Sequence, residues 1–295
     1  MSNQKELTSD LEAITSIKTI TSIYQEIASF RMNQLRGQVA KTREFLDGVA
    51  AVYNHTKTAY LASLQNVPFD NRKKKMIASG FLRKNGKRVD VLLSANEHLY
   101  GTLILDIWGY YLNEINNQKS DALVVGSFGK YLANNEKISG EVIYFDLDDD
   151  QPEASQIKKI VDVISKYEKV VVHHGQMISV ITQEPVQSEI SGGISYGQKI
   201  QKGTKRYLFE PSPEKILEFF ETEVIGALFN QTVLEHELAR FAARMIAMDQ
   251  ATENANEEIK KINRQLSNLR KRVLNSKQLQ VYAGFSLWKK EEKWF

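Results

Sequence analysis

The chain has no cysteine among its 295 residues, so disulfides and thiolate metal sites are excluded. No apolar run approaches the roughly 18 residues that a membrane-spanning helix needs. The polar start from Met1 to Lys5 is unlike a signal peptide. A formal net charge of +3 is too small to indicate nucleic-acid binding by itself. With 42% hydrophobic and 25% charged residues, the composition fits one folded core plus an extended element rather than a disordered chain.

Proline is absent from Glu214 to the end of the chain, and glycine occurs there only at Gly226 and Gly284. Just before this run, Ser212 is a good N-cap residue and Pro213 suits the first helical position, where its missing N–H is not needed. The sequence therefore predicts one helix of roughly 70 residues, on the order of 100 Å long at about 1.5 Å per residue.

The amino-terminal part is also free of proline, from Gln4 to Gln65. Apolar residues recur there every three or four positions, the spacing of one helical face: Leu7, Leu11, Ile14, Ile17, Ile20, Tyr24, Ile27 and Phe30. A short surface helix on an ordinary core would give the same pattern. Two long helices at opposite ends of one chain, however, can bury their apolar stripes on each other, and we predict an antiparallel coiled coil.

Between the two helices the pattern changes to short β-branched runs separated by helical stretches. We predict strands at 89–94, 122–126, 141–145, 169–173 and 177–181, with helices near 99–115, 130–134 and 152–167. Strands that alternate with helices predict a mostly parallel, Rossmann-like sheet, and hence an α/β fold. The expected domains are a coiled-coil helix at 1–67, an α/β head at 68–210, a second coiled-coil helix at 211–284 and a tail at 285–295.

The head offers few candidates for catalysis. The loop from Gly126 to Lys130 follows a predicted strand, but it lacks the G-x-x-x-x-G-K-[ST] spacing of a phosphate loop. The glycine-rich stretch 191–197 is expected to be a flexible loop, and the basic run 72–75 an exposed connection. His173 and His174 are neighbours, so on a strand they point to opposite faces and cannot readily share a metal. We expect them to have a structural role beside a turn.

Aspartates at 146 and 148–150 could suggest a cation-binding loop. The run lacks the ligand spacing and the glycine of a calcium loop, and we expect a solvated acidic linker instead.

One segment of the carboxy-terminal helix carries a specific resemblance. Ala242-Ala243-Arg244-Met245, Ala247-Met248, Ala251-Thr252 and Asn254 fit the A-A-R-M-x-A-M-x-x-A-T-x-N segment of the gamma subunit of F-type ATP synthases, the central rotor shaft. The stretch 207–211 fits the aromatic-E-P entry into that family's last helix. Looser matches lie at Lys5-Glu6-Leu7, Ile20-Thr21, Ala28 and Arg31-Met32. The chain thus resembles a divergent gamma subunit over nearly its whole length.

The departures from that family fall at defined places. In its S-x-R-G-L-C-G-G-x-N segment, this chain keeps only Ser94, Leu99 and Gly101, which affects the docking site expected for an epsilon-type subunit. The family's S-E pair becomes Ala239-Arg240. Its R-Q-A-x-I-T segment becomes the stretch 270–275, with only Arg270 retained, so contacts with the catalytic ring must differ there.

The resemblance implies a non-catalytic subunit of a proton-transporting ATP synthase or ATPase. Such shafts turn inside a ring of alpha and beta subunits, which bind ATP and magnesium, so no cofactor is expected on this chain. An epsilon-type subunit and a membrane rotor ring are further expected partners, and the expected location is cytoplasmic, peripheral on the inner face of the cell membrane. The implied contacts with the ring are Arg244, Met245, Met248, Arg270, Lys271, Arg272 and Asn275.

The stretch from Lys260 to Lys277 holds seven basic residues and no acidic one. A solvated basic face is the ordinary explanation for such a stretch. Inside an acidic-lined ring, the same side chains could slide past successive carboxylates, because partly solvated pairs contribute only about 0–1 kcal/mol each. Two alternatives to a rotor remain, namely a non-rotary coiled-coil scaffold in another assembly and a small-molecule enzyme that uses the Gly126 loop.

Overall fold

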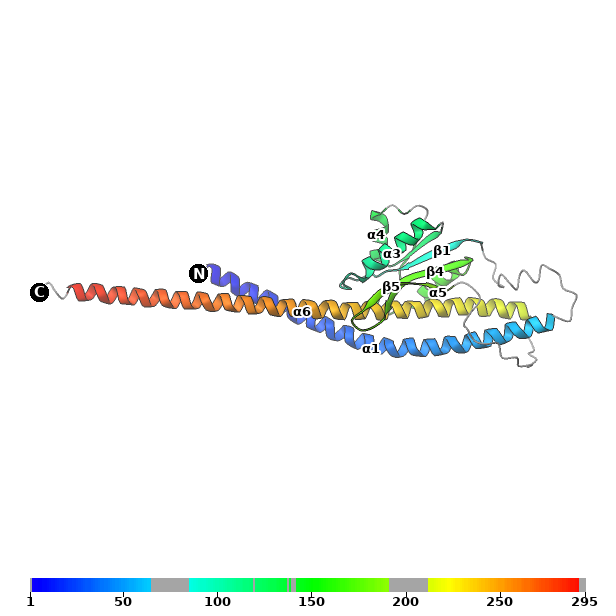
Figure 1. The fold of residues 1–295 in the computed structure, drawn as a ribbon, viewed down its shortest axis with the longest axis horizontal. Coiled ribbons are helices and arrows are strands. Elements are labelled where there is room, and N and C mark those ends of the chain that lie inside the picture. The colour runs from blue at the N-terminus through cyan, green and yellow to red at the C-terminus, as the bar shows by residue number, and fades with distance from the viewer. Residues whose placement is uncertain are drawn as a thin grey trace. The chain divides into compact units, whose positions relative to one another are not determined.

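The computed structural model describes residues 2–64, 85–118, 120–136, 138, 142–190 and 212–291. The chain forms two compact units. The first, here the helix-pair unit, consists of Met1–Ile27 and Met245–Phe295, and the second, here the head unit, consists of Ala28–Arg244. Two long helices pass through both units, α1 (Ser2–Leu64) and α6 (Pro213–Glu291), and all other elements belong to the head unit (Figure 1).

In the helix-pair unit, α1 and α6 run antiparallel. The hydroxyl oxygens of Thr21 and Thr252 are 2.8 Å apart, and four residues further along α1 the Gln25 amide donates to Asp249, which lies earlier on α6. On α6 the buried residues Met248, Ala255 and Ile262 repeat every seven positions, as in a coiled coil. The predicted antiparallel coiled coil is confirmed.

The seam of this coiled coil differs from the predicted apolar stripe. The less exposed positions of α1 are separated alternately by four and three residues, and they include polar side chains: Leu7, Leu11, Ile14, Lys18, Thr21 and Gln25. Ile17, Ile20 and Ile27 are about half exposed. The prediction followed hydrophobic residues, and after Ile14 these no longer coincide with the contact positions. A strict seven-residue period places lysine, threonine and glutamine at the contact there.

The sheet lies in the head unit and has the order β3-β2-β1-β4-β5. β1 (Arg88–Leu93), β2 (Asp121–Val125), β3 (Val142–Phe145) and β4 (Lys169–Met177) are parallel, and β5 (Gln183–Glu189) pairs antiparallel with β4. The mostly parallel α/β sheet is confirmed. The predicted fifth strand at 177–181 is wrong, because 178–181 form the turn between β4 and β5, with Ile178 and Ile181 exposed. The true β5 is polar and was missed.

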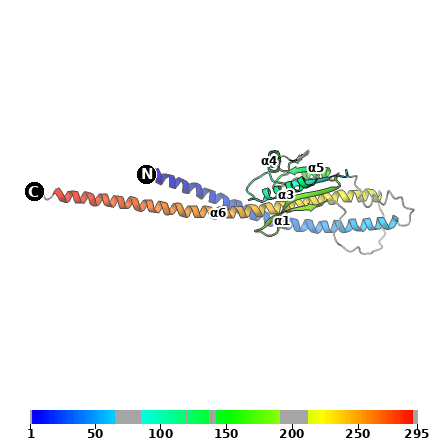
Figure 2. The ribbon, with the colours of Figure 1, turned by 45° about the horizontal axis from the view of Figure 1, so that its top comes forward.

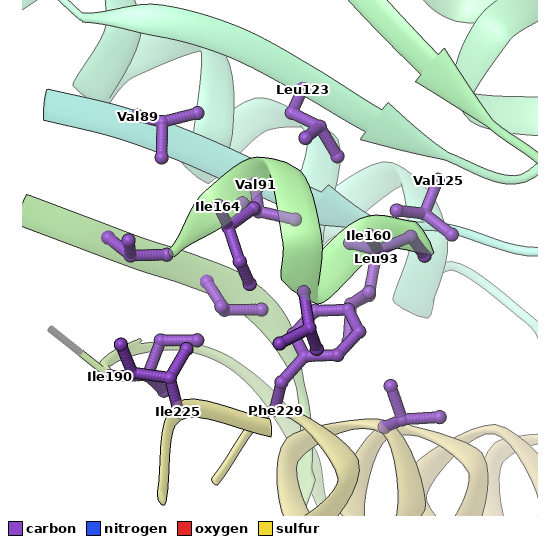
Figure 3. Close-up of a cluster of buried hydrophobic side chains, with 14 of the residues drawn as sticks. Val89, Val91, Leu93, Leu123, Val125, Ile160, Ile164, Ile190, Ile225 and Phe229 are labelled. Atoms are coloured by element: carbon purple, nitrogen blue, oxygen red, sulfur yellow. The ribbon is translucent and has the colours of Figure 1, made fainter. Parts of the chain in front are cut away.

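Helices cover both faces of the sheet. α3 (Leu103–Asn117) and α4 (Ser127–Asn135) share one core with Leu92 and Val124. α5 (Ala154–Ile164) shares the opposite core with α6. In Figure 3, Ile160 and Ile164 of α5 lie between the strand residues of that core and the side chains that α6 contributes, Ile225 and Phe229. The head is therefore built directly onto α6 rather than tethered to it.

The head-unit portions of α1 and α6 are also antiparallel. Arg43 donates to Glu235 at 2.8 Å, and the Tyr53 hydroxyl donates to Glu221 at 3.0 Å. Ala28, Met32, Leu35 and Leu46 of α1 are buried. Within the described ranges, no helix combines the length and the apolar character that crossing a bilayer requires.

Candidate coupling surfaces of the long helices

Arg244, in the segment that resembles the gamma family most closely, is buried in the head unit. Its guanidinium donates to the Glu97 carboxylate at 2.6 Å and to the His98 carbonyl at 3.1 Å. It also lies 4.3 Å from the centre of the Tyr100 ring, within cation–π range. The planar fork of arginine allows this combination of contacts, which the point charge of a lysine would not reproduce.

Arg240, one turn earlier on α6, forms a second buried ion pair. Its guanidinium donates to the Asp149 carboxylate at 2.5 Å and to the Asp149 carbonyl at 3.0 Å. The other carboxylate oxygen of Asp149 accepts from the backbone amides of Asn96 and Glu97, both at 2.8 Å. The prediction that the aspartate run is a solvated linker is therefore wrong for Asp149, although Asp146 and Asp148 are exposed.

These residues form one arginine cluster, consisting of Arg240, Arg244, Glu97, Tyr100 and Asp149. It joins α6 to the loop after β1 and to the loop after β3. Leu99 in the first loop has a φ of 74°, an uncommon value for a residue with a side chain, and Gly101 has a φ of 58°. This loop is the stretch that departs from the gamma family, and in this chain it supplies the partners of α6.

His236 makes a further buried connection between α6 and the sheet. Its Nδ1 accepts from the Gly175 amide at 3.1 Å, and its Nε2 donates to the Ser94 carbonyl at 3.0 Å. Burial holds the pKa of His236 well below its usual range, and the charge of Arg240 adds to that effect. A neutral imidazole satisfies both backbone groups, so this histidine is structural.

The other candidate contact residues lie in the helix-pair unit. Met248 is buried and Met245 is half-buried there, whereas Arg270, Lys271, Arg272 and Asn275 are exposed. At about 1.5 Å per residue, Met248 and Arg270 are about 33 Å apart along α6, so they cannot form one site. Met248 lies in the buried seam of the helix pair, whereas Arg270 lies on the exposed surface of α6.

The end of α6 extends past the start of α1, as Figures 1 and 2 both show. Large apolar side chains are exposed on this single-helix part: Val273, Leu274, Leu279, Val281, Tyr282 and Phe285. Together with the basic residues at 270–272, they give α6 an end that is both apolar and positively charged. Such a mixed surface is typical of a segment that another protein covers.

The Gly126 loop does not form a phosphate cradle. The amide of Ser127 is bonded to the Asn96 side chain at 2.8 Å, and the amide of Phe128 is bonded to the Ala95 carbonyl at 2.9 Å. Gly126 has a φ of 99°, and a Cβ there would lie 3.1 Å from Ala95 backbone atoms. The glycine therefore permits close packing of two loops, and the first amides of α4 are already used.

The two histidines lie within β4 and not beside a turn, so that part of the prediction is wrong. They do point to different partners: His173 bonds Asp90 at 2.8 Å, and His174 bonds Ser188 at 2.8 Å. Burial alone would raise the pKa of Asp90, but hydrogen bonds from His173 and Arg88 lower it. Asp90 thus stays ionised inside the head, bonded to Arg88 at 2.7 and 2.8 Å.

Among the described residues, no cluster of three or more histidine, cysteine, aspartate or glutamate side chains could hold a metal ion. The stretches 72–75, 191–197 and 207–211 lie outside the described residues. Sequence reasoning missed Glu97 and Asp149 as partners of α6, and it missed Glu237. A usable signal was the presence of Glu237 and Arg240 in an otherwise apolar and small-residue stretch of α6, since charges there require partners.

The described residues form a pair of long antiparallel helices that carries a mostly parallel sheet domain. The family model named ATP synthase matches residues 3–286. The chain belongs to the ATP synthase family.

Curated relatives include two proteins named ATP synthase gamma chain. That of Vesicomyosocius okutanii is 21% identical over 300 residues, covering 95% of this chain and 97% of the relative. That of Ruminiclostridium cellulolyticum is 24% identical over 300 residues, covering 96% and 98%. The gamma-type assignment made from the sequence is thereby confirmed, and with it the role of a rotor shaft in a rotary ATP synthase.

Solved structures support the same fold. A chain of the Euglena gracilis mitochondrial ATP synthase superposes with a TM-score of 0.51 at 13% identity, covering 90% of this chain and 97% of that one. A central-stalk chain of the Tetrahymena thermophila mitochondrial ATP synthase gives a TM-score of 0.52 at 14% identity, covering 79% and 99%. At such identities the likeness shows the shared fold alone.

Proposed function

We propose that this chain turns inside a ring of alpha- and beta-type subunits and couples ion-driven rotation to the synthesis or hydrolysis of ATP. The observation that carries this proposal is the exposed end of α6, where basic and apolar side chains lie beyond the start of α1. A ring that surrounds the helix pair would cover these side chains. Because each contact is individually weak, the helix could pass from one subunit of the ring to the next.

The arginine cluster supports the transfer of torque within the chain. Its two ion pairs and the Tyr100 contact connect α6 to two separate loops of the head unit, so a force applied to the head reaches α6 through several bonds. Rotary coupling is an exchange of free energy between sites through differential contacts in discrete states. It needs no covalent step on this chain, and ATP and magnesium would bind to the ring.

In this proposal the ring is contacted directly by Met245, Arg270, Lys271, Arg272 and Asn275, whereas the buried Arg244 and Met248 act through the packing of the chain beneath that surface. The head unit would face a membrane rotor ring and an epsilon-type subunit, and the chain would then lie peripherally on the inner face of the cell membrane. The head loop that departs from the gamma family would alter the docking of an epsilon-type subunit, because its Glu97 is bonded to Arg244.

Co-purification tests the proposal. An affinity tag on the chain should retain alpha- and beta-type ATPase subunits, and the complex should hydrolyse ATP, whereas the purified chain alone should not. Recovery of other partners without any alpha- or beta-type chain would instead support the non-rotary scaffold.

A further inference from the structure

A pocket of about 350 Å³ opens in the head unit between the two long helices and the loop that precedes α5. Its lining is mostly polar. α1 contributes Arg31, Gln34, Leu35 and Gln38, the loop contributes 150–152, and α6 contributes Asn230, Leu234 and Glu237. None of the functions assigned above uses this pocket.

Glu237 is the unusual member of the lining. The residue is 4% exposed, and among the described residues its carboxyl oxygens are not counted with the fully buried polar atoms that lack a partner, so they keep some exposure. Burial raises the pKa of Glu237 to about 7, with Asp149 and Asp150 adding to the rise and Arg240 and Arg31 opposing it. Because Glu237 lines the pocket, a group that enters from outside the chain can donate to its carboxyl oxygens there.

No charged group in the described part of the chain forms an ion pair with the Glu237 carboxyl group. Arg240 is bonded to Asp149, and Arg31 lines the pocket but forms no salt bridge with Glu237 among the described residues. Glu237 and Asp150 together give the pocket two carboxyl groups against one guanidinium, so a phosphate or another anion is disfavoured. The amide oxygens of Gln34, Gln38 and Asn230 can accept further hydrogen bonds from a group rich in N–H donors.

We propose that this pocket receives a lysine or arginine side chain from a neighbouring subunit of the ATP synthase assembly, whose cationic group pairs with Glu237. The inference rests on the proposed function, since it requires a partner subunit beside the head unit. The contact would fix the partner to the paired helices through one buried charge pair. Such pairs contribute mainly to specificity and register, because breaking one leaves an uncompensated buried charge.

Pairing with a cation requires the ionised form of Glu237, so association must release a proton when the pH lies below about 7. The partner should therefore bind more tightly at pH 8 than at pH 6. The charges that face Glu237 are Arg31 from α1, Asp149 and Asp150 from the loop, and Arg240 from α6. A substitution that removes the carboxylate should remove this pH dependence.

The first experiment titrates the full chain against the purified complex of the other subunits, at pH 6 and pH 8. We compare wild type with Glu237→Gln and with Glu218→Gln, a matched control on an exposed part of the same helix. We expect Glu237→Gln to weaken binding about tenfold at pH 8 and to abolish the difference between the two pH values. We expect Glu218→Gln to match wild type. Equal affinities of wild type and Glu237→Gln at pH 8 would overturn the proposal.

The second experiment measures the binding of methylguanidinium and butylammonium to the full chain alone by NMR, with acetate as the anionic control. We expect cation binding in wild type and its loss in Glu237→Leu. If small cations bind but Glu237→Gln assembles like wild type, the occupant is a free cation, and the claim of a partner side chain is wrong. If wild type binds no alpha- or beta-type subunit, the proposed function fails, and the NMR result alone decides whether the pocket selects cations.

Discussion

Arg240 on α6 and Asp149 in the loop after β3 form an ion pair in which both side chains are less than 10% exposed. Taking two charges out of water costs several kcal/mol each, so a buried pair contributes little net stability unless further hydrogen bonds compensate. Here the backbone amides of Asn96 and Glu97 complete the shell of the Asp149 carboxylate. The pair therefore fixes where the two loops sit on α6.

We predict that Arg240→Met destabilises the full chain by about 3–5 kcal/mol, because it leaves Asp149 buried and unpaired. Chemical denaturation monitored by circular dichroism measures the change. The double variant Arg240→Met with Asp149→Leu should recover a large part of the loss, since it removes both charges. A loss below 1 kcal/mol in the single variant would show that Asp149 reaches water.

The antiparallel register of the helix-pair unit can be tested by a disulfide, because the chain has no cysteine of its own. The Thr21 and Thr252 hydroxyl oxygens are 2.8 Å apart, so the paired substitutions Thr21→Cys and Thr252→Cys should give a disulfide on mild oxidation. Mass spectrometry and gel mobility detect it. The pair Thr19→Cys and Thr252→Cys is the control and should stay reduced, since Thr19 is exposed. If the control pair forms the disulfide and the pair at 21 and 252 does not, the two helices adopt a different register in solution.

Glu237 predicts a pH dependence of stability. Burial raises the pKa of Glu237 from its ordinary value of 4.5 to about 7 in the folded chain, so the folded form binds the proton more tightly than the unfolded form. The resulting stability is fully present below pH 4.5 and is lost as the pH rises through 7, by about 3 kcal/mol in total. We expect Glu237→Gln to match wild type near pH 4.5 and to be more stable at pH 8. Parallel unfolding curves for the two chains across this range would contradict the prediction.

Arg244→Ala should lower the coupled ATP turnover of the complex several-fold, with a smaller effect on assembly. The variant removes the bonds to Glu97 and His98 and the contact with Tyr100. Glu97→Gln separates two causes. If turnover depends on the bond within the chain, Glu97→Gln will share the loss, and if it depends on the ring, Glu97→Gln will stay near wild type. Wild-type turnover in Arg244→Ala would show that Arg244 contributes only to helix packing and not to coupling.

Reversing the charges of Arg270, Lys271 and Arg272 to glutamate should slow turnover several-fold at low salt. The difference should shrink as salt rises, because exposed charges beyond roughly 8 Å are largely screened at about 0.15 M. Deletion of residues 289–295 should cost little and serves as the comparison. Steady-state ATPase assays across a salt series provide the measurement. Normal rates after the reversal at low salt would contradict the prediction and show that the end of α6 contacts the ring through shape complementarity and not through charge.

The sequence by itself determined the architecture and the family. Long proline-free stretches at both ends predict helices. The β-branched runs that alternate with helical stretches predict a parallel sheet in the middle of the chain. The segment from Ala242 to Asn254 was specific enough to indicate a gamma-type subunit. These features are local or depend on short spacings between residues, so they can be recognised in the sequence without a three-dimensional structure.

Only the tertiary structure decided which charges are buried. Arg240 and Asp149 are 91 positions apart, and no local pattern relates an aspartate in a loop to an arginine on a distant helix. The same holds for Glu237, whose pocket needs both long helices and a loop. The seam of the coiled coil was misjudged because hydrophobicity favoured Ile17 and Ile20, whereas a strict seven-residue period buries Thr21. Long-range packing sets each of these outcomes, because burial depends on which surfaces meet and not on residue type alone.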